Sequence, residues 1–535
     1  MSSASRHNGP VNRSIGNAYD RSITPVTPVT PVAPSASGSD FLQLNPEEAP
    51  AGGLSDWLAR RLRDAIADGS LPVGSRLPAT RVLAGELRVS RGVVTEAYQR
   101  LTEDGHVAGR GRGGTVVVAV PAAPPVAPAP VAPAAGSGDP AGAAVFAVTP
   151  PGADVFDALR AAPARIDLSP GVPDLAAFPR AAWLRAERAV LKGLSASGLG
   201  YGDPRGALEL RRAVANWLAR NRGIRVDAGE VLITSGTAQG LGLLAQVLRD
   251  DGIRAMAVED PGSLGARHHL RDRQLETPPV AVDAEGVRVD ELRATGARAV
   301  LLTPAHQFPT GVVLGGVRRR ELMRWAGEGG LIVEDDYDAE HRYDRPPVPA
   351  LRSVLAERVC YAGSVSKLLA PALRVGWMLA PPKYRDALVE AKRFADLGNA
   401  VLPQLVLARL MESGEMERHL RLLRRRHRQR RDAMIAAIGE QLPGAVVHGA
   451  AAGLHLVITF ESAEFADTGL AGAALARGVK VQPLSWHRQR PGHPGLVLGY
   501  AATPPGGIAE GVATLGQALS EVVPGVVPGV RPRGR

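Results

Sequence analysis

The stretch YAGSVSKLLAPALRVG (361–376) carries the clearest chemical signal in this chain of 535 residues. Its apolar start is typical of a buried strand, and Lys367 follows where that strand ends. A lysine in such a place is costly unless its amine is neutralised or bonded. Burial also lowers the pKa of the amine, which makes it a competent nucleophile for Schiff-base formation. The hydroxyls of Ser364 and Ser366 and the guanidinium of Arg374 suit a nearby phosphate.

The stretch LIVEDDYD (331–338) predicts a second buried strand, which ends in carboxylates. Because the carboxyl ends of parallel strands share one edge of a sheet, we expect Asp335 and Lys367 to face one pocket. Pyridoxal 5'-phosphate (PLP) needs this pair: a lysine for the Schiff base and an acid that keeps the pyridine nitrogen protonated. Tyr337 can donate a hydrogen bond to the ring oxygen. The two stretches together indicate a PLP site.

The stretch VLITSGTAQG (231–240) predicts a strand, a turn of small residues and the start of a helix. The exposed N–H groups at Gly236 and Thr237 would form a cradle for a phosphate. Taken alone, this stretch is more often an ordinary turn between a strand and a helix. From about residue 165 to 520, short apolar runs alternate with longer helical patterns. This alternation predicts an α/β fold class with a mostly parallel sheet.

The N-terminal third of the chain contains a shorter, helical pattern. Asp56 is predicted to cap a helix over 57–68, and a second helix is expected over 81–87. Ser90 is predicted to cap a third helix over 91–103, so that the last two helices form a helix-turn-helix.

Residues 107–118 then predict a β-hairpin with a Gly-rich, arginine-bearing tip, which would be a wing. A recognition helix presents the side chains of its first turn to base edges, while nearby arginines hold phosphates. The alternative interpretation is three packed helices with solvated arginines. The candidate DNA-binding residues are Arg81, Ser90, Arg91, Thr95, Arg110 and Arg112.

Low-complexity and proline-rich segments separate these regions. The predicted segments are a disordered low-complexity tail (1–53), a winged helix-turn-helix domain (54–120), a Pro/Ala-rich linker (121–160), a large PLP-binding domain (161–520) and a flexible tail (521–535).

Composition restricts the remaining possibilities. The formal charge of +10 fits a nucleic-acid partner, although an arginine-biased sequence would show it equally well. A single cysteine excludes an intrachain disulfide, and the scattered histidines lack metal-ligand spacing, so no metal is predicted. No apolar stretch is long enough to span a membrane, and we expect a cytoplasmic protein with no membrane contact. The arginine-rich run 424–431 is interpreted as a solvated helix face rather than a second DNA patch.

The stretch LRDAIADGSLPVGSRLPATRVLAGELRVSRGVVTEAYQRLTEDGHV (62–107) resembles the winged-helix domain of GntR-type regulators. The large region resembles the aspartate-aminotransferase-like, fold-type I PLP domain over about 350 residues. A GntR-type winged helix joined by a linker to such a domain resembles the MocR family of bacterial transcription regulators. The stretches that carry the second resemblance include GVPDLAAFPRAAWLRA (171–186), YGDPRGALELRRAVANWLARNRGI (201–224), TPAHQFPTG (303–311), EDDYDAE (334–340) and SVSKLLAPALRVGW (364–377).

This resemblance implies PLP bound as an aldimine to Lys367, with Asp335 at the pyridine nitrogen and Tyr337 at the ring oxygen. It also implies a homodimer, arranged head to tail, that reads double-stranded DNA at an operator with paired half-sites. The residues that it places around the phosphate are Gly236, Thr237, Ser364, Ser366, Arg374 and, from the partner subunit, Tyr201; His306 is placed near the cofactor.

Three positions depart from the aminotransferase pattern. Ser263 stands where an aromatic residue is expected to stack on the pyridine, and Phe308 replaces an asparagine that bonds the ring oxygen. Val497 aligns with an arginine that binds the substrate carboxylate. We therefore expect weaker PLP binding and no clamp for an amino-acid carboxylate.

Three hypotheses follow from these observations. The first is a PLP-dependent transcription regulator that senses PLP, an amine or an amino acid through a domain that is not an active enzyme. The second is an aminotransferase with an appended DNA-binding module. The third is a regulator whose large domain is only a dimerisation scaffold, for which Ser263 is the motive.

Overall fold

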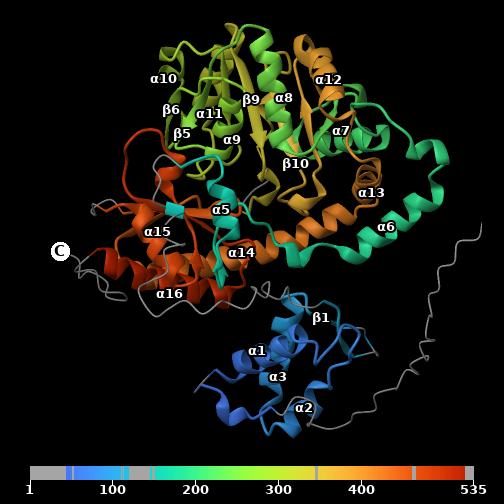
Figure 1. Ribbon diagram of the computed structural model, residues 1–535, viewed down its shortest axis with the longest axis vertical. Helices are drawn as coiled ribbons and strands as arrows, with labels where there is room; N and C mark the ends of the chain where they lie inside the picture. The colour runs from blue at the N-terminus through green and yellow to red at the C-terminus, as the bar shows by residue number, and fades with distance from the viewer. Residues whose placement is uncertain are drawn as a thin grey trace, which may run out of the picture. The chain divides into compact units, whose positions relative to one another are not determined.

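The structure is a computed structural model that describes residues 44–50, 53–109, 111, 114–119, 145–146, 151–343, 348–460 and 465–523. The chain divides into two compact units, Met1–Pro125 and Val126–Arg535 (Figure 1). Most of the predicted tails and linker lies outside the described residues, as do Arg110 and Arg112 of the predicted wing.

The first unit contains three helices and a two-stranded hairpin. Its elements are α1 (Leu54–Ala67), α2 (Thr80–Glu86), α3 (Arg91–Glu103), β1 (Val107–Gly109) and β2 (Thr115–Val117). The two strands are antiparallel, and Ala108 lies opposite Val116. The predicted winged helix-turn-helix is therefore confirmed.

The helix caps agree with the sequence at one helix and differ at another. Ser90 caps α3, because its hydroxyl accepts a hydrogen bond from the backbone N–H three residues later at 3.4 Å. The predicted start of α1 at Trp57, with Asp56 as its cap, is wrong. The helix begins at Leu54, after Gly53. Asp56 lies instead in the first turn, where its negative charge interacts favourably with the helix dipole.

The predicted N-terminal tail extends too far along the chain. Pro46–Glu48 form a short 3-10 helix, and Leu44 and Ala49 pack against the core of the first unit. Burying these two apolar side chains against the core is favourable, which explains why the domain begins before the predicted boundary at residue 53.

An eight-stranded sheet forms the centre of the second unit, in the order β4-β11-β10-β9-β8-β5-β6-β7. All strands except β11 and β7 run parallel to one another, which confirms the predicted α/β class. The strands are β4 (Leu232–Thr234), β5 (Met256–Asp260), β6 (Pro279–Asp283), β7 (Gly286–Val287), β8 (Ala299–Leu302), β9 (Leu331–Asp336), β10 (Val359–Ser364) and β11 (Gly376–Leu379).

Helices cover both faces of this sheet, so its strands are apolar on both sides. Along β10, Cys360 and Ala362 pack in the core beneath one helix layer, while Val359 and Tyr361 pack beneath the other. The first layer contains α8 (Thr237–Asp250), α9 (Leu264–Asp272) and α12 (Pro382–Asp396). The second layer contains α7 (Leu208–Arg222), α10 (Val289–Ala294) and α11 (Gly316–Gly327).

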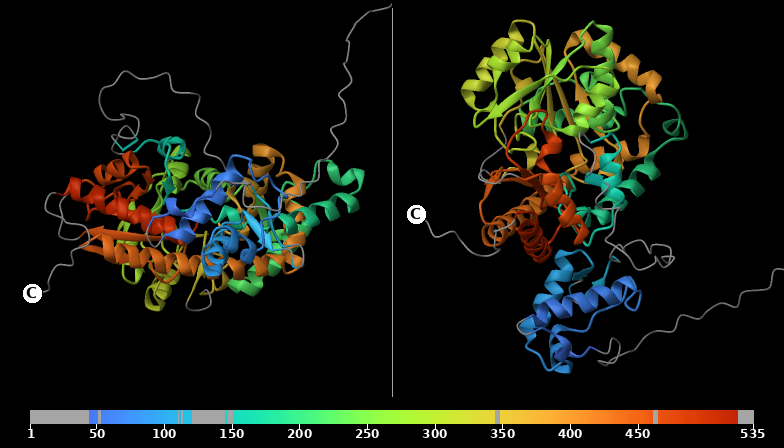
Figure 2. Two further views of the ribbon diagram at one scale, coloured as in Figure 1. Left: turned by 90° about the horizontal axis from the view of Figure 1, so that it is seen from below. Right: turned by 60° about the vertical axis from the view of Figure 1, so that its left-hand side comes forward.

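A smaller antiparallel sheet in the order β12-β13-β16-β15 forms the C-terminal part of the unit. It shares an apolar core with three helices, of which α14 and α16 lie side by side (Figure 2). The strands are β12 (Ala445–His448), β13 (His455–Phe460), β15 (Gln482–Pro483) and β16 (Gly495–Gly499), and the helices are α14 (Glu415–Gln441), α15 (Asp467–Ala476) and α16 (Pro505–Val522). Two further helices, α6 (Arg180–Gly193) and α13 (Val401–Glu412), pack against each other.

The segment before the large sheet belongs to this smaller part, contrary to the predicted linker, which reached residue 160. Helix α5 (Val155–Ala161) buries an apolar side, and Phe146 stacks on Trp486 with ring centroids 5.2 Å apart. Strand β3 (Ile166–Asp167) pairs with β14 (Val479–Lys480). The linker was predicted too long because isolated apolar residues in a Pro/Ala-rich stretch give no periodic pattern.

The interpretation of the run 424–431 as a solvated helix face is also wrong in part. It lies within α14, where Arg430 and Arg426 both contact the carboxylate of Asp174, at 2.9 and 2.8 Å. Arg431 lies over the ring of Tyr343, 4.9 Å from its centroid. Several of these arginines therefore bind the chain itself.

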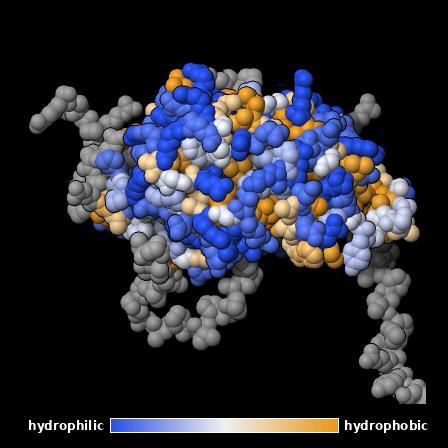
Figure 3. Space-filling view, turned by 90° about the horizontal axis from the view of Figure 1, so that it is seen from above, coloured by the Kyte–Doolittle hydropathy of each residue, from blue (hydrophilic) through white to orange (hydrophobic). Residues whose placement is uncertain are grey.

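No described helix is both long and apolar enough to cross a membrane. On the face seen in Figure 3, hydrophilic side chains are mixed with small groups of apolar ones.

Candidate functional site

The carboxyl ends of three strands meet at one edge of the large sheet. Strand β9 ends at Asp336 and pairs in parallel with β10, so that Asp335 lies opposite Ala362. Lys367 follows the end of β10 by three residues. Strand β4 ends just before Gly236 and the start of α8. The topology thus brings three of the predicted elements of the site to one place.

Successive side chains of a strand point to opposite faces of the sheet, and this alternation separates Asp335 from the carboxylates on either side of it. Asp336 accepts hydrogen bonds from Arg222 at 2.5 Å and from Tyr361 at 2.6 Å, within the core. Glu334 accepts the backbone N–H groups of residues 351 and 352. Both carboxylates therefore have structural partners, and Asp335 points the other way.

Asp335 has an acceptor atom that nothing in the described chain satisfies. Its Oδ1 is buried without a hydrogen-bond partner among the described residues. Burial raises the pKa of Asp335 to about 7, with added repulsion from Asp336 and Asp338, while Lys367 acts in the opposite direction. A buried, unpaired acid of this kind fits a ligand that presents an N–H group, such as the protonated pyridine nitrogen of PLP.

The raised pKa of Asp335 predicts a pH effect on the stability of the cofactor-free protein. Since the folded state holds this proton more tightly than the unfolded chain, stability falls as pH rises from about 4 to about 7. Asp335→Asn removes this loss. The free energy of unfolding of the variant relative to the parent is therefore expected to rise by about 2 to 3 kcal/mol between about pH 5 and about pH 8, measured as an increase in the difference between their thermal midpoints. A difference that does not change with pH would contradict the buried carboxyl.

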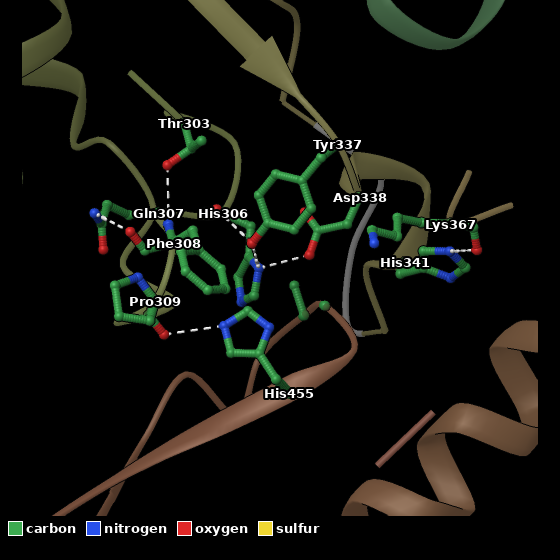
Figure 4. Close-up of polar contacts among 12 residues, drawn as sticks. Thr303, His306, Gln307, Phe308, Pro309, Tyr337, Asp338, His341, Lys367 and His455 are labelled. Carbon is green, nitrogen blue, oxygen red and sulfur yellow. Dashed lines mark hydrogen bonds and ion pairs between the residues drawn. The ribbon is translucent and has the colours of Figure 1, made fainter. Parts of the chain in front are cut away.

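The amine of Lys367 donates a hydrogen bond to the carbonyl of Gly171 at 2.5 Å. Burial lowers the pKa of Lys367, while Asp338 and then Asp335 act to raise it. Figure 4 shows the amine beside the carboxylate of Asp338. A lysine with a lowered pKa is the nucleophile that Schiff-base chemistry requires.

The predicted phosphate residues gather at the first turn of α8. Gly236 precedes the helix with φ +83°, a conformation that favours glycine. The guanidinium of Arg374 lies 3.4 Å from the position that a Cβ of Gly236 would take, and it donates to the carbonyl of Ser235. Free N–H groups at a helix start, together with a cation, form an anion site. Thr237 begins the helix.

Ser364 is the last residue of β10, and Ser366 follows it on the loop that leads to Lys367. The N–H of Ser366 donates to the hydroxyl of Ser364 at 3.4 Å. Tyr201 differs from the other candidates, because its side chain is 94% exposed and has little contact within the chain.

His306 lies between the side chains of Tyr337 and Asp338. Its Nδ1 lies 2.8 Å from Oδ2 of Asp338 and 3.1 Å from the hydroxyl of Tyr337 (Figure 4). The hydroxyl of Tyr337 also donates to the carbonyl of His306 at 3.2 Å. Sequence reasoning singled out His306 and Tyr337 but missed Asp338 and the carbonyl of Gly171. The carboxylate of Asp338 was visible in EDDYDAE, yet no spacing rule shows that it turns inward.

The three departures from the aminotransferase pattern have clear structural roles. Ser263 caps α9, its hydroxyl accepting a hydrogen bond from the N–H of Ala266 at 3.2 Å. The ring of Phe308 packs edge-on against Tyr337, with centroids 6.1 Å apart. Val497 is fully buried in β16, in a small apolar cluster with Val457 and Leu484.

Four of the six candidate DNA-binding residues lie within the described part of the first unit. Arg81, Ser90, Arg91 and Thr95 are all exposed. The guanidinium of Arg91 donates to the hydroxyl of Thr80 at 3.4 Å, which ties the starts of α2 and α3 together. Arg88, exposed in the turn between the helices, was not singled out from the sequence.

Both units match known protein families. Residues 54–117 match the family described as bacterial regulatory proteins, gntR family, and residues 164–492 match aminotransferase class I and II. The chain thus joins a DNA-binding helix-turn-helix domain to an aminotransferase-like domain of fold-type I, a fold that is typically dimeric.

Full-length relatives share this combination. The chain is 31% identical to the probable rhizopine catabolism regulatory protein MocR of Rhizobium meliloti, over 86% of this chain and 93% of that protein. It is 29% identical to the pyridoxine biosynthesis transcriptional regulator PdxR of Corynebacterium glutamicum, over 86% and 94%. The chain belongs to the MocR-type family of helix-turn-helix transcription regulators.

A solved structure resembles the second unit. The aminotransferase LysN of Thermus thermophilus, complexed with N-(5'-phosphopyridoxyl)-L-leucine, superposes with a TM-score of 0.63 at 28% identity. The match covers 71% of this chain and 97% of that chain.

Proposed function

We propose that this transcription regulator binds PLP in its aminotransferase-like domain and uses it to sense a small amine or PLP itself. The observation that carries the proposal is the pairing, at one sheet edge, of a lysine with a lowered pKa and a buried acid with an unsatisfied oxygen. The phosphopyridoxyl group in the similar LysN structure supports the same ligand class.

In this proposal each group of residues has one task. Lys367 supplies the amine that bonds to the cofactor, and Asp335 accepts the N–H of its ring. The phosphate would lie at Gly236 and Thr237, within reach of Arg374, with Ser364 and Ser366 as further donors. Tyr337 and His306 would lie at the ring oxygen. When bound, PLP supplies an aldehyde carbon with which primary amines react.

Addition of PLP to the purified protein should produce a visible absorption band. Borohydride reduction followed by peptide mass spectrometry should then place the cofactor on Lys367. A protein that stays colourless would instead favour the dimerisation scaffold.

We propose a sensor rather than an enzyme, and an amine rather than an amino acid, because of Val497. Its apolar cluster offers no charge to a carboxylate. A ligand of this site shifts operator affinity only if it binds two states of the protein differently. An effector that favours one orientation of the DNA-binding units would meet that condition.

The effector class can be tested with a matched pair of ligands, 2-phenylethylamine and phenylalanine. In the PLP-loaded parent, the amine is expected to change the absorption band at a concentration at least about tenfold lower than the amino acid. Val497→Arg should reduce or reverse that preference, because a guanidinium binds a carboxylate through two hydrogen bonds. Val497→Lys, with the thermal midpoint of each variant, controls for the cost of a buried charge. An equal response of the parent to both ligands would contradict the proposal.

The proposed assembly is a head-to-tail homodimer that reads paired half-sites. The exposed Tyr201 supports it, since a site that uses this side chain is complete only with a second copy. Candidate contacts to DNA are Arg81, Ser90, Arg91 and Thr95, with Arg110 and Arg112 on the wing.

A further inference from the structure

Asp338 is a buried carboxylate of the site, although no spacing in the sequence pointed to it. Its side chain is 2% exposed, and its carboxylate accepts a hydrogen bond from Nδ1 of His306 at 2.8 Å. A carboxylate can only accept, so Nδ1 of His306 carries the proton. The titratable groups around Asp338 are Asp335, Tyr337, His306, His341, Tyr343, Lys367, His455 and Tyr500.

Glycines hold this pair in a closed slot. A Cβ on Gly453 would lie 2.1 Å from Cε1 of His306 and 2.9 Å from Oδ2 of Asp338, and the residue has φ +86°. A Cβ on Gly311 would lie 3.0 Å from Nε2 of His306. The imidazole and the carboxylate therefore have little room to turn.

The pair of His306 and Asp338 interacts with two residues of the proposed cofactor site, Tyr337 and Lys367. The phenol of Tyr337 contacts Nδ1 and the carbonyl of His306, so its hydroxyl is fixed by the residue that Asp338 orients. Asp338 also lies near Lys367, where its negative charge acts to raise the pKa of the amine against the lowering effect of burial (Figure 4). Asp335 also influences both side chains electrostatically, but Asp338 is the one of the two that accepts a hydrogen bond from His306.

We propose that Asp338 is a positioning residue of the cofactor site: it orients His306 and, through it, the hydroxyl of Tyr337, and it is the counter-ion of the nitrogen at Lys367. The inference rests on the proposed PLP site. It differs from the role of Asp335, whose free oxygen suits the ring nitrogen.

The counter-ion role predicts the pH titration of the visible band in the PLP-loaded full-length protein. Asp338→Asn removes a negative charge near the nitrogen, so the pKa of the band is expected to fall by about one to three units. His306→Gln keeps that charge and should not lower the pKa. His487→Gln, at a buried histidine that contacts Phe308, is the matched control and should leave the pKa unchanged.

The positioning role is tested by the affinity for PLP in a double-mutant cycle with Tyr337→Phe. Asp338→Asn and His306→Gln should each weaken PLP binding in the parent, by about tenfold, and much less when the phenol hydroxyl is absent. A merely structural role would lower the thermal midpoint without this coupling. His306→Gln keeps the test open if Asp338→Asn fails to fold.

The visible band distinguishes a failure of the proposed PLP site from a failure of the role of Asp338. If the parent shows no band, the proposed function and this inference both fall. If the parent shows the band but Asp338→Asn leaves its pKa in place, or if the affinity effects add independently of Tyr337, only the inference is overturned.

Discussion

Lys367→Ala is expected to abolish the visible absorption band that PLP gives with the parent protein, and borohydride should then fix no cofactor to the chain. The reason is chemical, since alanine has no amine to form the covalent bond. The fold should survive, because the lysine donates only one hydrogen bond, to a backbone carbonyl. Absorption spectra and peptide mass spectrometry check the result.

Lys192→Ala is the matched control, since Lys192 is exposed on α6 and far along the chain from the sheet edge. It should leave the band unchanged. A Lys367→Ala protein that keeps a reducible band would show that another lysine holds the cofactor. The proposed sensor would then lose its central residue.

Arg91→Ala is expected to weaken binding to a promoter fragment by about 10- to 100-fold, the loss of about 1–3 kcal/mol typical of an arginine at base edges. Arg91 is the first residue of α3, and its side chain is exposed. Its contact with Thr80 places it at the junction of the two helices of the motif. Mobility-shift titrations at one fixed salt concentration measure the effect, because phosphate contacts make affinity salt-dependent.

Arg60→Ala provides the comparison, as an exposed arginine of α1 outside the helix-turn-helix. It should change affinity much less. Equal affinities of Arg91→Ala and the parent would show that the recognition helix is placed wrongly. If both variants lose affinity alike, the effect would reflect overall charge and not recognition.

The proposed cofactor site depends on elements that are distant in sequence. Lys367 touches Gly171, whose loop continues to Asp174, and Asp174 is bound by Arg426 and Arg430 of α14. A change at the amine of Lys367 is therefore expected to affect the segment from Gly171 to Asp174, which binds α14, the longest described helix of the unit.

Local pattern was enough to predict several features of the protein. The cap at Ser90, the hairpin after α3, and the parallel strands that end near Asp335 and Lys367 all follow from short-range chemistry. Periodicity and capping act within a few residues, so they can be read along the chain.

The sequence by itself determined the two domain types and the lysine and the acid that face one sheet edge. Only the tertiary structure decided that Asp338 turns inward, that Gly171 meets Lys367 across 196 positions, and that the arginines of α14 bind the chain itself. These contacts join segments far apart in sequence, and their geometry is set by packing. No periodicity or spacing along the chain predicts the geometry of these contacts.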